Sequence, residues 1–379
     1  MSQIPENTID ERVDERLARE PLFAYLRSNG LDGKFEIRQF PAGSSNLTYL
    51  LKTGTDEYVL RRPPFGNTVK TAHDMRREFE VLSKLSAVYA PAPKPLLYCD
   101  DDAIVGSEFY LMECRRGLII RGRIPDVGSP RVNSPHDSKG SSQSTDRPVS
   151  PHDLNTSQAA RERVCQSFIR NLAELHSLDY TAAGLGELGK PVGYCRRQVE
   201  GWTKRYFAAK TDEHPALEAV ITWLSENVPA ESGASLIHND YKFDNIILDP
   251  EDLTRVTAVL DWEMVTVGDP LMDLGTTLGY WMSADAGKEM LSMPFNPRIL
   301  MENVSRRELA DMYSEASGRD VSNILFYYAF GTFKVAVIAQ QIYARFVKGF
   351  TKDNRFANFD RFVAALGLIA DNAIERECI

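Results

Sequence analysis

Short runs rich in large apolar residues, separated by turn residues, mark the first third of the chain and predict β-strands. Between the third and fourth of these runs, residues 71–86 carry large apolar side chains every three or four positions, which predicts a helix. We therefore expect a small α+β lobe of five short strands with one helix inserted after the third. The expected strands cover residues 35–40, 48–53, 57–62, about 95–99 and 107–114.

A helical spacing of apolar residues precedes this lobe and also follows it. Residues 8–30 carry an apolar stripe that ends at Asn29-Gly30, which predicts an N-terminal helix. Because only one β section, residues 235–260, interrupts the later helices, the second part of the chain is expected to be mostly helical. Its expected helices cover residues 156–177, about 196–208, 214–226, 270–283 and 306 to the end.

The expected order of domains is an N-terminal helix in residues 1–28, an N-lobe in 29–116 and a C-lobe in 117–379. Within the C-lobe the composition changes at about residues 125–153, where Ser, Pro, Asp, Gly and charged residues dominate. Such a segment cannot bury enough apolar surface to offset the entropy lost on ordering. We expect a disordered surface insertion there, most simply a tolerated loop with no role of its own.

Composition and charge narrow the class of protein. The formal net charge of -9 argues against nucleic-acid binding, because that affinity comes mainly from Lys and Arg. The five cysteines are scattered and form no Cys-x-x-Cys pair, so neither a disulfide framework nor a zinc site is indicated. The first 20 residues lack the apolar core of a signal peptide, and no apolar run reaches membrane-spanning length. We expect a cytoplasmic protein without membrane insertion.

The chemistry is concentrated in two neighbouring segments of the β section. In the first, apolar residues bracket the polar loop His238-Asn-Asp-Tyr-Lys-Phe-Asp-Asn245, and in the second an apolar run ends at Asp261. Phosphoryl transfer needs a carboxylate beside the attacking hydroxyl, a carboxylate on Mg²⁺, and a neutral oxygen that completes the metal shell. Asp240, Asp261 and Asn245 fit these three roles in that order. The spacing His-x-Asp-x-x-x-x-Asn is that of a kinase catalytic loop.

These segments resemble the aminoglycoside phosphotransferase and choline kinase-like family, and most closely the kinase-like domains associated with certain acyl-CoA dehydrogenases. The resemblance extends over about residues 30–375, apart from the insertion. It rests on the catalytic loop together with Leu260-Asp-Trp-Glu263, Gly268-Asp-Pro-Leu-Met-Asp-Leu-Gly275, Tyr58-Val-Leu-Arg-Arg-Pro-Pro64, Arg77-Glu-Phe-Glu-Val-Leu82 and Leu172-Ala-Glu-Leu-His-Ser-Leu-Asp179. It implies a two-lobed protein-kinase-like fold with ATP and Mg²⁺ as cofactors.

The resemblance also implies a nucleotide site in the N-lobe. Gly43, Ser44, Ser45 and Asn46 occupy the place of the turn whose backbone N–H groups cover the phosphates. Arg61 stands where most relatives carry the phosphate-binding Lys, with Glu78 as its partner. Arg62 is the alternative phosphate contact, although strand alternation sends the two side chains to opposite faces. Met112, Glu113 and Cys114 resemble the hinge that meets the adenine edge.

Several of these residues also have a simpler, structural interpretation. A lone Asp in a loop is usually a turn residue, and Glu78 could be a solvated helix charge. His238 is expected to order the loop by donating a hydrogen bond, and His176 to be a packed core histidine. Asp269 before Pro270 suits a helix N-cap.

The function these observations favour is an ATP- and Mg²⁺-dependent phosphotransferase acting on a hydroxyl group of a small molecule. The resemblance suggests a hydroxyacyl-CoA or related metabolite, with an aminoglycoside-like compound as the alternative substrate. Position alone suggests substrate contacts from Arg197, Trp202, Tyr206 and residues 326–346. The competing function is a nucleotide-binding pseudokinase that regulates a partner. The sequence contains no Walker A, His-Glu-x-x-His or Gly-x-Ser-x-Gly motif, and no Ala-Pro-Glu segment follows Asp261.

Overall fold

The computed structural model divides the chain into two compact units. Unit 1 comprises Met1–Arg116 with Ala258–Glu263, and unit 2 comprises Gly117–Thr257 with Met264–Ile379. The short segment 258–263, which the sequence placed in the C-lobe, thus groups with the first unit. The structure describes residues 8–41, 46–54, 56–65, 74–121, 147–282, 298–351 and 353–379.

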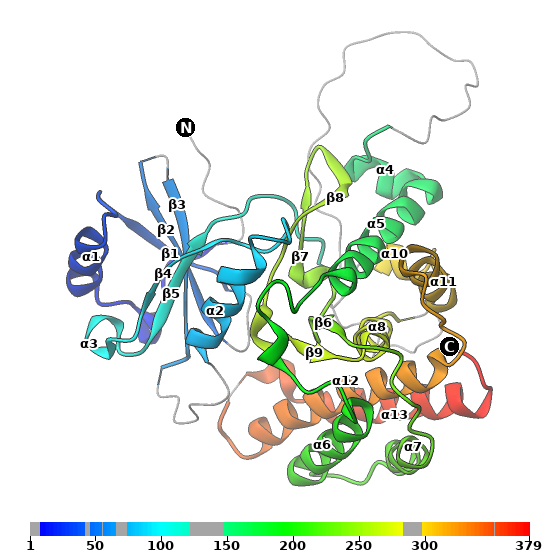
Figure 1. The fold of residues 1–379 in the computed structure, drawn as a ribbon. Helices are drawn as coiled ribbons and strands as arrows, with labels where there is room; N and C mark the ends of the chain where they lie inside the picture. Colours follow the sequence, from blue (N-terminus) through cyan, green and yellow to red (C-terminus); the bar gives the residue numbers. More distant parts are fainter. Residues whose placement is uncertain are drawn as a thin grey trace. The chain divides into compact units, whose positions relative to one another are not determined.

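Unit 1 is built on a five-stranded antiparallel sheet in the order β1-β2-β3-β5-β4 (Figure 1). Helix α2 (Met75–Leu85) follows the third strand as predicted, and a short helix α3 (Asp102–Val105) precedes the last. The five strands and the helix after the third confirm the predicted α+β class. The strands are β1 (Glu36–Gln39), β2 (Leu47–Thr53), β3 (Asp56–Arg62), β4 (Pro95–Cys99) and β5 (Phe109–Glu113).

The N-terminal segment is less helical than its apolar stripe predicts. Helix α1 covers only Arg19–Ser28, and before it Ile9 forms a β-bridge with Gln39 and Val13–Glu15 is a single 3-10 turn. Side chains capture main-chain N–H groups that a longer helix would use: Gln39 Oε1 accepts from Arg12 N at 2.9 Å. Helix α1 buries Leu22 and Leu26 in the core of unit 1.

Unit 2 is mostly helical, as predicted, with two small antiparallel β elements (Figure 1). Strand β6 (Ser235–Ile237) pairs with β9 (Thr266–Gly268), and β7 (Ile246–Asp249) pairs with β8 (Asp252–Val259), whose end enters unit 1. The helices are α4 (Pro151–Thr156), α5 (Gln158–Ser177), α6 (Tyr194–Ala209), α7 (Pro215–Glu226), α8 (Pro270–Gly279), α10 (Arg298–Met301), α11 (Arg306–Ser317), α12 (Ile324–Val347) and α13 (Phe359–Glu375).

Helices α8 and α12 form the centre of unit 2 and approach each other backbone to backbone. A Cβ atom added at Gly275 would overlap the carbonyl oxygen of Tyr327, and one added at Gly331 would overlap that of Gly275. A Cβ at Gly279 would lie 2.7 Å from the carbonyl carbon of Gly331. Only glycine permits such close packing. The crossing therefore fixes where the side chains next to these glycines lie.

The disordered insertion predicted at about 125–153 is contradicted only in residues 147–153, which the structure describes. Residues 122–146 lie outside the described residues, but Val149 is buried and Ser150 caps α4 in a reciprocal capping box with Asp153. The main chain of Val149 also bonds to the β8 segment, accepting from Leu253 N at 2.8 Å. The sequence analysis missed the buried Val149 and the capping pair of Ser150 and Asp153, because most residues around them are polar.

Among the described residues, no helix has both the length and the apolar character needed to cross a membrane.

Candidate active site

The loop between β6 and β7 in unit 2 holds Asp240, the predicted base, in a network of donors. Its Oδ1 accepts from the Tyr280 hydroxyl at 2.8 Å, and its Oδ2 accepts from Lys242 Nζ at 2.6 Å and from Asn245 Nδ2 at 3.0 Å. Burial acts to raise the pKa of Asp240, but Lys242 and Tyr280 outweigh it and hold that pKa below its usual range. The carboxylate is therefore ionised at neutral pH.

Asn245 ends the 3-10 turn Phe243–Asn245 and lies against Asp240 through its amide nitrogen. Its Nδ2 also donates to the main-chain oxygen of Asp240 at 2.9 Å. Since the nitrogen is engaged twice, the side-chain oxygen Oδ1 is the atom that Asn245 can offer to a cation. A neutral oxygen at this position matches the role that the spacing predicts.

Asp273 of α8 holds the main chain of this loop. The sequence reasoning did not single this residue out. Asp273 is fully buried and accepts from the main-chain N–H groups of His238 at 2.6 Å and Asn239 at 2.7 Å. Its Oδ2 also lies 3.1 Å from Nε2 of His176. His176 is thus a core histidine, as expected, and it orients the carboxylate that holds the loop.

The ring of His238 contacts the main chain within this loop. Its Nδ1 accepts from the Asp240 amide at 3.2 Å, because the amide two residues later turns back onto the ring. This bond helps to order the loop, and the expectation that the ring also donates a hydrogen bond stays a prediction. Asp269, by contrast, is the N-cap of α8, accepting from Leu271 N at 2.8 Å as predicted.

Lys334 of α12 is a second loop contact that sequence reasoning missed. Its ammonium is buried and donates to the main-chain oxygen of Asn239 at 2.7 Å. Burial lowers the pKa of Lys334 to about 8, against the opposing effect of nearby Asp273 and Asp240. The one available signal was a lysine in the apolar first half of this helix.

Unit 1 contains the second cluster of predicted residues, Arg61, Glu78 and Asp261. Arg61 projects from β3, and its Nη2 lies 2.9 Å from Asp261 Oδ1 and 3.5 Å from Glu78 Oε1. Glu78 is on the first turn of α2 and is only 1% exposed. It is therefore a buried side chain and not a solvated one. Burial acts to lower the pKa of Arg61, but the two carboxylates hold it well above its ordinary value. Arg61 is a permanent cation.

One atom of this cluster has spare bonding capacity. Within the described part of the chain, Nε of Arg61 is buried and has no hydrogen-bond partner. A buried N–H donor without a partner is costly, which favours an anionic ligand such as a phosphate oxygen at this point. An arginine with an unused N–H is a donor of the kind that phosphate oxygens accept from.

Arg62 points to the opposite face of the sheet, and its guanidinium is committed to unit 1 itself. It donates from Nε to the Pro63 carbonyl at 2.9 Å and from Nη1 to the Val105 carbonyl at 2.5 Å. The guanidinium carbon also lies 3.6 Å from the ring centroid of Phe65. Of the two arginines, only Arg61 faces the carboxylates.

The remaining N-lobe residues are placed in part. Gly43, Ser44 and Ser45 lie outside the described residues, whereas Asn46 donates from Nδ2 to Glu263 Oε2 at 2.8 Å. In the predicted hinge, Met112 and Glu113 end β5, followed by Cys114. The Glu113 amide donates to the Lys94 carbonyl at 2.9 Å, so this amide is already engaged.

The residues suggested for substrate contacts are not equally available. Trp202 and Tyr206 are buried in α6, and Tyr206 bonds to Glu218 at 3.3 Å. Arg197 is exposed and donates to the main-chain oxygens of Lys190 and Val192. All three therefore make structural contacts.

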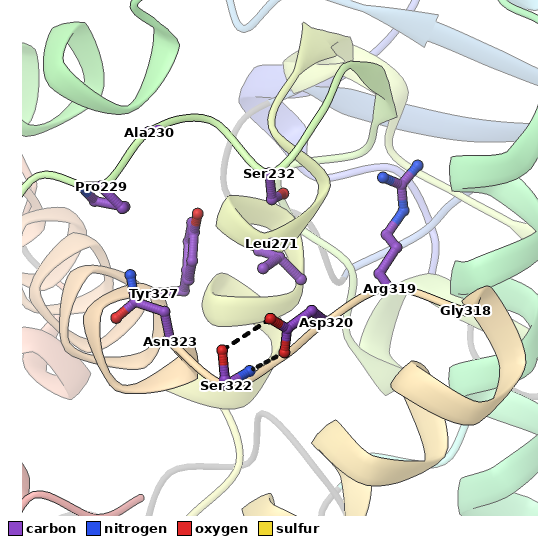
Figure 2. A pocket seen from close by; sticks show the side chains of 10 residues that line it. All are labelled: Pro229, Ala230, Ser232, Leu271, Gly318, Arg319, Asp320, Ser322, Asn323 and Tyr327. Atoms are coloured by element: carbon purple, nitrogen blue, oxygen red, sulfur yellow. Dashed lines mark hydrogen bonds between the residues drawn. The ribbon is translucent and has the colours of Figure 1, made fainter.

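A separate pocket of about 420 Å³ in unit 2 is lined by Tyr327, which belongs to the segment 326–346 suggested for substrate contacts, but by none of the residues assigned to the base, the nucleotide or the metal (Figure 2). Asp320 accepts there from the main-chain N–H of Ser322 at 2.8 Å and from its hydroxyl at 3.0 Å. Arg319 donates to Ser235 Oγ at 2.9 Å. Because these charged groups are paired within the protein, the pocket gives no indication of a ligand.

With this geometry in place, comparison with known proteins identifies the class. Residues 36–133 and 145–295 match the family model described as the phosphotransferase enzyme family, APH. The chain belongs to this family, which confirms the resemblance. It is 35% identical over 360 residues to acyl-CoA dehydrogenase family member 11 of Rattus norvegicus, and 34% identical over 339 residues to that of Gallus gallus. These matches cover 91% and 88% of the chain, but only 42% and 40% of those relatives.

Solved structures confirm the kinase-like fold. A protein from Ralstonia eutropha assigned to the aminoglycoside phosphotransferases has a TM-score of 0.74 and 28% identity, with 95% of this chain and 99% of that one covered. Choline kinase from Cryptosporidium parvum has a TM-score of 0.59 and 11% identity, with 94% and 97% covered. The second likeness concerns the fold alone.

Proposed function

We propose that the chain is an ATP- and Mg²⁺-dependent phosphotransferase that acts on a hydroxyl group of a small molecule, with Asp240 as its base. The observation that carries this proposal is the state of Asp240, which is ionised, half-buried and held by three donors. A carboxylate has about four lone-pair positions, so one remains on Oδ1 for the acceptor hydroxyl.

The low pKa of Asp240 suggests how it acts. Phosphoryl transfer passes through a loose transition state, in which the attacking hydroxyl needs orientation more than early removal of its proton. An ionised carboxylate in a fixed position accepts the hydroxyl hydrogen bond, and it takes the proton as the bond to phosphorus forms. Lys242 and Tyr280 keep it in that position.

The nucleotide is assigned to unit 1. The partnerless Nε of Arg61 would bind a phosphate oxygen, and Glu78 would hold the guanidinium in place. The turn of Gly43, Ser44, Ser45 and Asn46 would cover the phosphates, and the main chain of Met112, Glu113 and Cys114 would meet the base. These last two assignments rest on the family resemblance.

For the metal, we assign Asp261 and Asn245, one carboxylate and one neutral amide oxygen. Hard oxygen ligands of this kind suit Mg²⁺, whose remaining positions are usually taken by phosphates and water. The described residues contain no cluster of three His, Cys, Asp or Glu side chains. When bound, the ion neutralises charge on the phosphates.

The substrate proposed is a hydroxyacyl-CoA or a related hydroxylated metabolite. Its support is the match to relatives named acyl-CoA dehydrogenase family members, although the chain spans only about two-fifths of their length. An aminoglycoside-like substrate is the alternative, since another protein of this fold was solved with hygromycin B and AMP-PNP. A cytoplasmic location stays a prediction from the sequence.

The competing proposal is a pseudokinase, which would bind nucleotide without transferring phosphate. Arg61 in place of the usual Lys favours it. However, Arg keeps the charge, and its forked donors suit phosphate oxygens. The presence of Asp240, Asn245 and Asp261 together favours the enzyme.

The test is phosphate transfer from labelled Mg²⁺-ATP to a panel of hydroxyacyl-CoA esters and aminoglycosides. We expect transfer to one class, and Asp240→Ala should lower turnover by about 10²–10⁴-fold with little change in ATP affinity. Asp249→Asn, which changes a carboxylate in the strand after the loop, is the matched control and should retain activity. ATP binding with no transfer and no slow hydrolysis would favour the pseudokinase.

A further inference from the structure

The peptide group that joins Asn239 to Asp240 is held at both of its polar ends. Its carbonyl oxygen accepts from the Lys334 ammonium at 2.7 Å, and its N–H donates to His238 Nδ1 at 3.2 Å. This peptide leads directly into the residue assigned as the base. Its orientation therefore determines the direction in which the Asp240 side chain leaves the loop.

The same peptide follows a backbone conformation that is unfavourable on its own. Asn239 has φ of 68°, in the left-handed region that non-glycine residues seldom occupy. Such a conformation persists only where the surroundings impose it. Asp273 binds the N–H of Asn239, Met264 O accepts from its Nδ2 at 3.0 Å, and Lys334 binds its carbonyl.

The glycine crossing described above brings Lys334 to this point. Lys334 lies one helical turn after Gly331 on α12, and Asp273 lies two residues before Gly275 on α8. Because these helices touch backbone to backbone, a cation from one and a carboxylate from the other reach the same loop. Lys334 is only 1% exposed, so its ammonium bonds to the protein rather than to water.

We propose that Lys334 is a positioning residue, whose bond to the Asn239 carbonyl orients the peptide that carries Asp240. The catalytic consequence rests on the function proposed above, but the loop geometry does not. A side chain misplaced by about 1 Å can lower turnover by about 10²-fold, so one buried hydrogen bond is sufficient for this role.

The charge of Lys334 gives the proposal a pH dependence. The charged groups that act on it are Asp273 of α8, Asp240 and Lys242 of the loop, and Arg205 of α6. Since its pKa is about 8 in the folded protein and about 10.4 when unperturbed, the ammonium loses its proton as pH rises through about 8. The bond from Lys334 to the loop should weaken there. The free energy of unfolding should nevertheless rise with pH up to about pH 10, because over that range the unfolded chain keeps a proton that the folded protein has lost.

The experiment measures hydrogen exchange of the Asp240 amide, corrected for intrinsic rates, together with turnover on Mg²⁺-ATP with water as acceptor. Lys334→Met should lower protection of that amide and turnover by about 10–100-fold each, with the KM for ATP unchanged. Lys348→Met, an exposed change at the C-cap of the same helix, should alter neither. Normal protection in Lys334→Met would overturn the proposal, whether or not the chain proves to be a kinase.

Lys334→Arg covers the case in which the methionine variant does not fold. Arginine stays charged, so the loss of protection near pH 8 should disappear in this variant. The wild-type protein supplies the remaining measurement, because protection of the Asp240 amide should fall as pH rises from 7 to 9. Constant protection over that range would overturn the proposal without any variant. Turnover lost with protection intact would assign Lys334 to the substrate and overturn the positioning role.

Discussion

Arg61 and Asp261 form an ion pair within unit 1, with Nη2 of the arginine 2.9 Å from Oδ1 of the aspartate. The residue assigned to the phosphates and the carboxylate assigned to the metal are therefore bound to each other. A buried arginine is unfavourable unless it is paired, so this contact helps to hold the Arg61 side chain in place. A bound Mg²⁺-nucleotide would supply a new partner to each.

Asp261→Asn should weaken the binding of Mg²⁺-ATP much more than the binding of metal-free ATP. The change removes the strongest protein ligand of the ion, but it also relieves repulsion between a carboxylate and the phosphates. Asparagine can still accept the bond from Arg61, so the fold should be retained. Calorimetric titration with and without Mg²⁺, in wild type and variant, measures the four affinities.

The matched control is Asp32→Asn, which removes an exposed carboxylate from the same unit and should leave all four affinities unchanged. If Asp261→Asn keeps the full Mg²⁺ dependence of binding and turnover, Asp261 is not the metal ligand.

Asp273→Asn should destabilise the protein by about 2–4 kcal/mol at pH 7 and lower turnover as well. The carboxylate accepts from two main-chain N–H groups and lies beside His176, whereas an amide would turn a donor toward one of them. Urea unfolding of both proteins measures the difference, and Asp311→Asn, an exposed change on α11, should stay within about 0.5 kcal/mol of wild type.

The effect of Asp273 should also depend on pH. Burial acts to raise its pKa, but bonding to His176 and the loop outweighs burial, so the folded pKa is lowered. Stability from such a group is present above the unfolded pKa of about 3.9 and is lost as pH falls through the folded value. The difference between wild type and Asp273→Asn should therefore shrink below about pH 4. A difference that stays constant there would mean that its ionisation does not stabilise the fold.

Gly331→Ala should destabilise unit 2 by about 1–3 kcal/mol, because its methyl group would meet the backbone of α8 and neither helix can yield easily. Gly201→Ala is the matched control: this helical glycine of α6 has open space around it, and alanine should stabilise by about 0.5–1 kcal/mol. Thermal unfolding compares the two. Equal effects would contradict the close crossing of α8 and α12.

Deleting residues 128–145 and deleting residues 128–150, with the same Gly-Ser bridge, should have different effects. The shorter deletion removes only the polar segment and should leave the melting temperature unchanged. The longer one also removes buried Val149 and the cap of α4, which should lower stability by about 3 kcal/mol. A large loss in the shorter deletion would show that the segment packs against the protein.

Local pattern was sufficient to predict the elements of the sheet and most helices, because strand and helix periodicities are properties of short windows. It failed at Val13, where the apolar spacing was helical but the side chain is 75% exposed. It failed again at Val149, whose burial depends on a contact with β8 about 100 residues later. In both places distant partners decided the outcome.

In the candidate site, too, local pattern predicted one part, and contacts between distant residues decided the other. The spacing from His238 to Asn245 predicted a polar loop between strands, and the loop has that form. Asp273 and Lys334, which hold it, are 35 and 95 residues from their partners and come from helices that are mostly apolar. No short motif contains them, so their contacts could be found only in three dimensions.

The left-handed backbones of Asn239 and Asp261 have a consequence for anyone who selects improved variants of this protein. Glycine adopts φ near +68° freely, but at these two positions it would also remove side-chain bonds, since Asn239 Nδ2 donates to Met264 O and Asp261 accepts from Arg61. The relief of backbone strain would therefore be offset by the loss of a loop anchor in one case and of the partner of a buried arginine in the other. Libraries built to raise heat resistance should keep both positions constant, because the usual exchange of a left-handed residue for glycine would not repay its cost here.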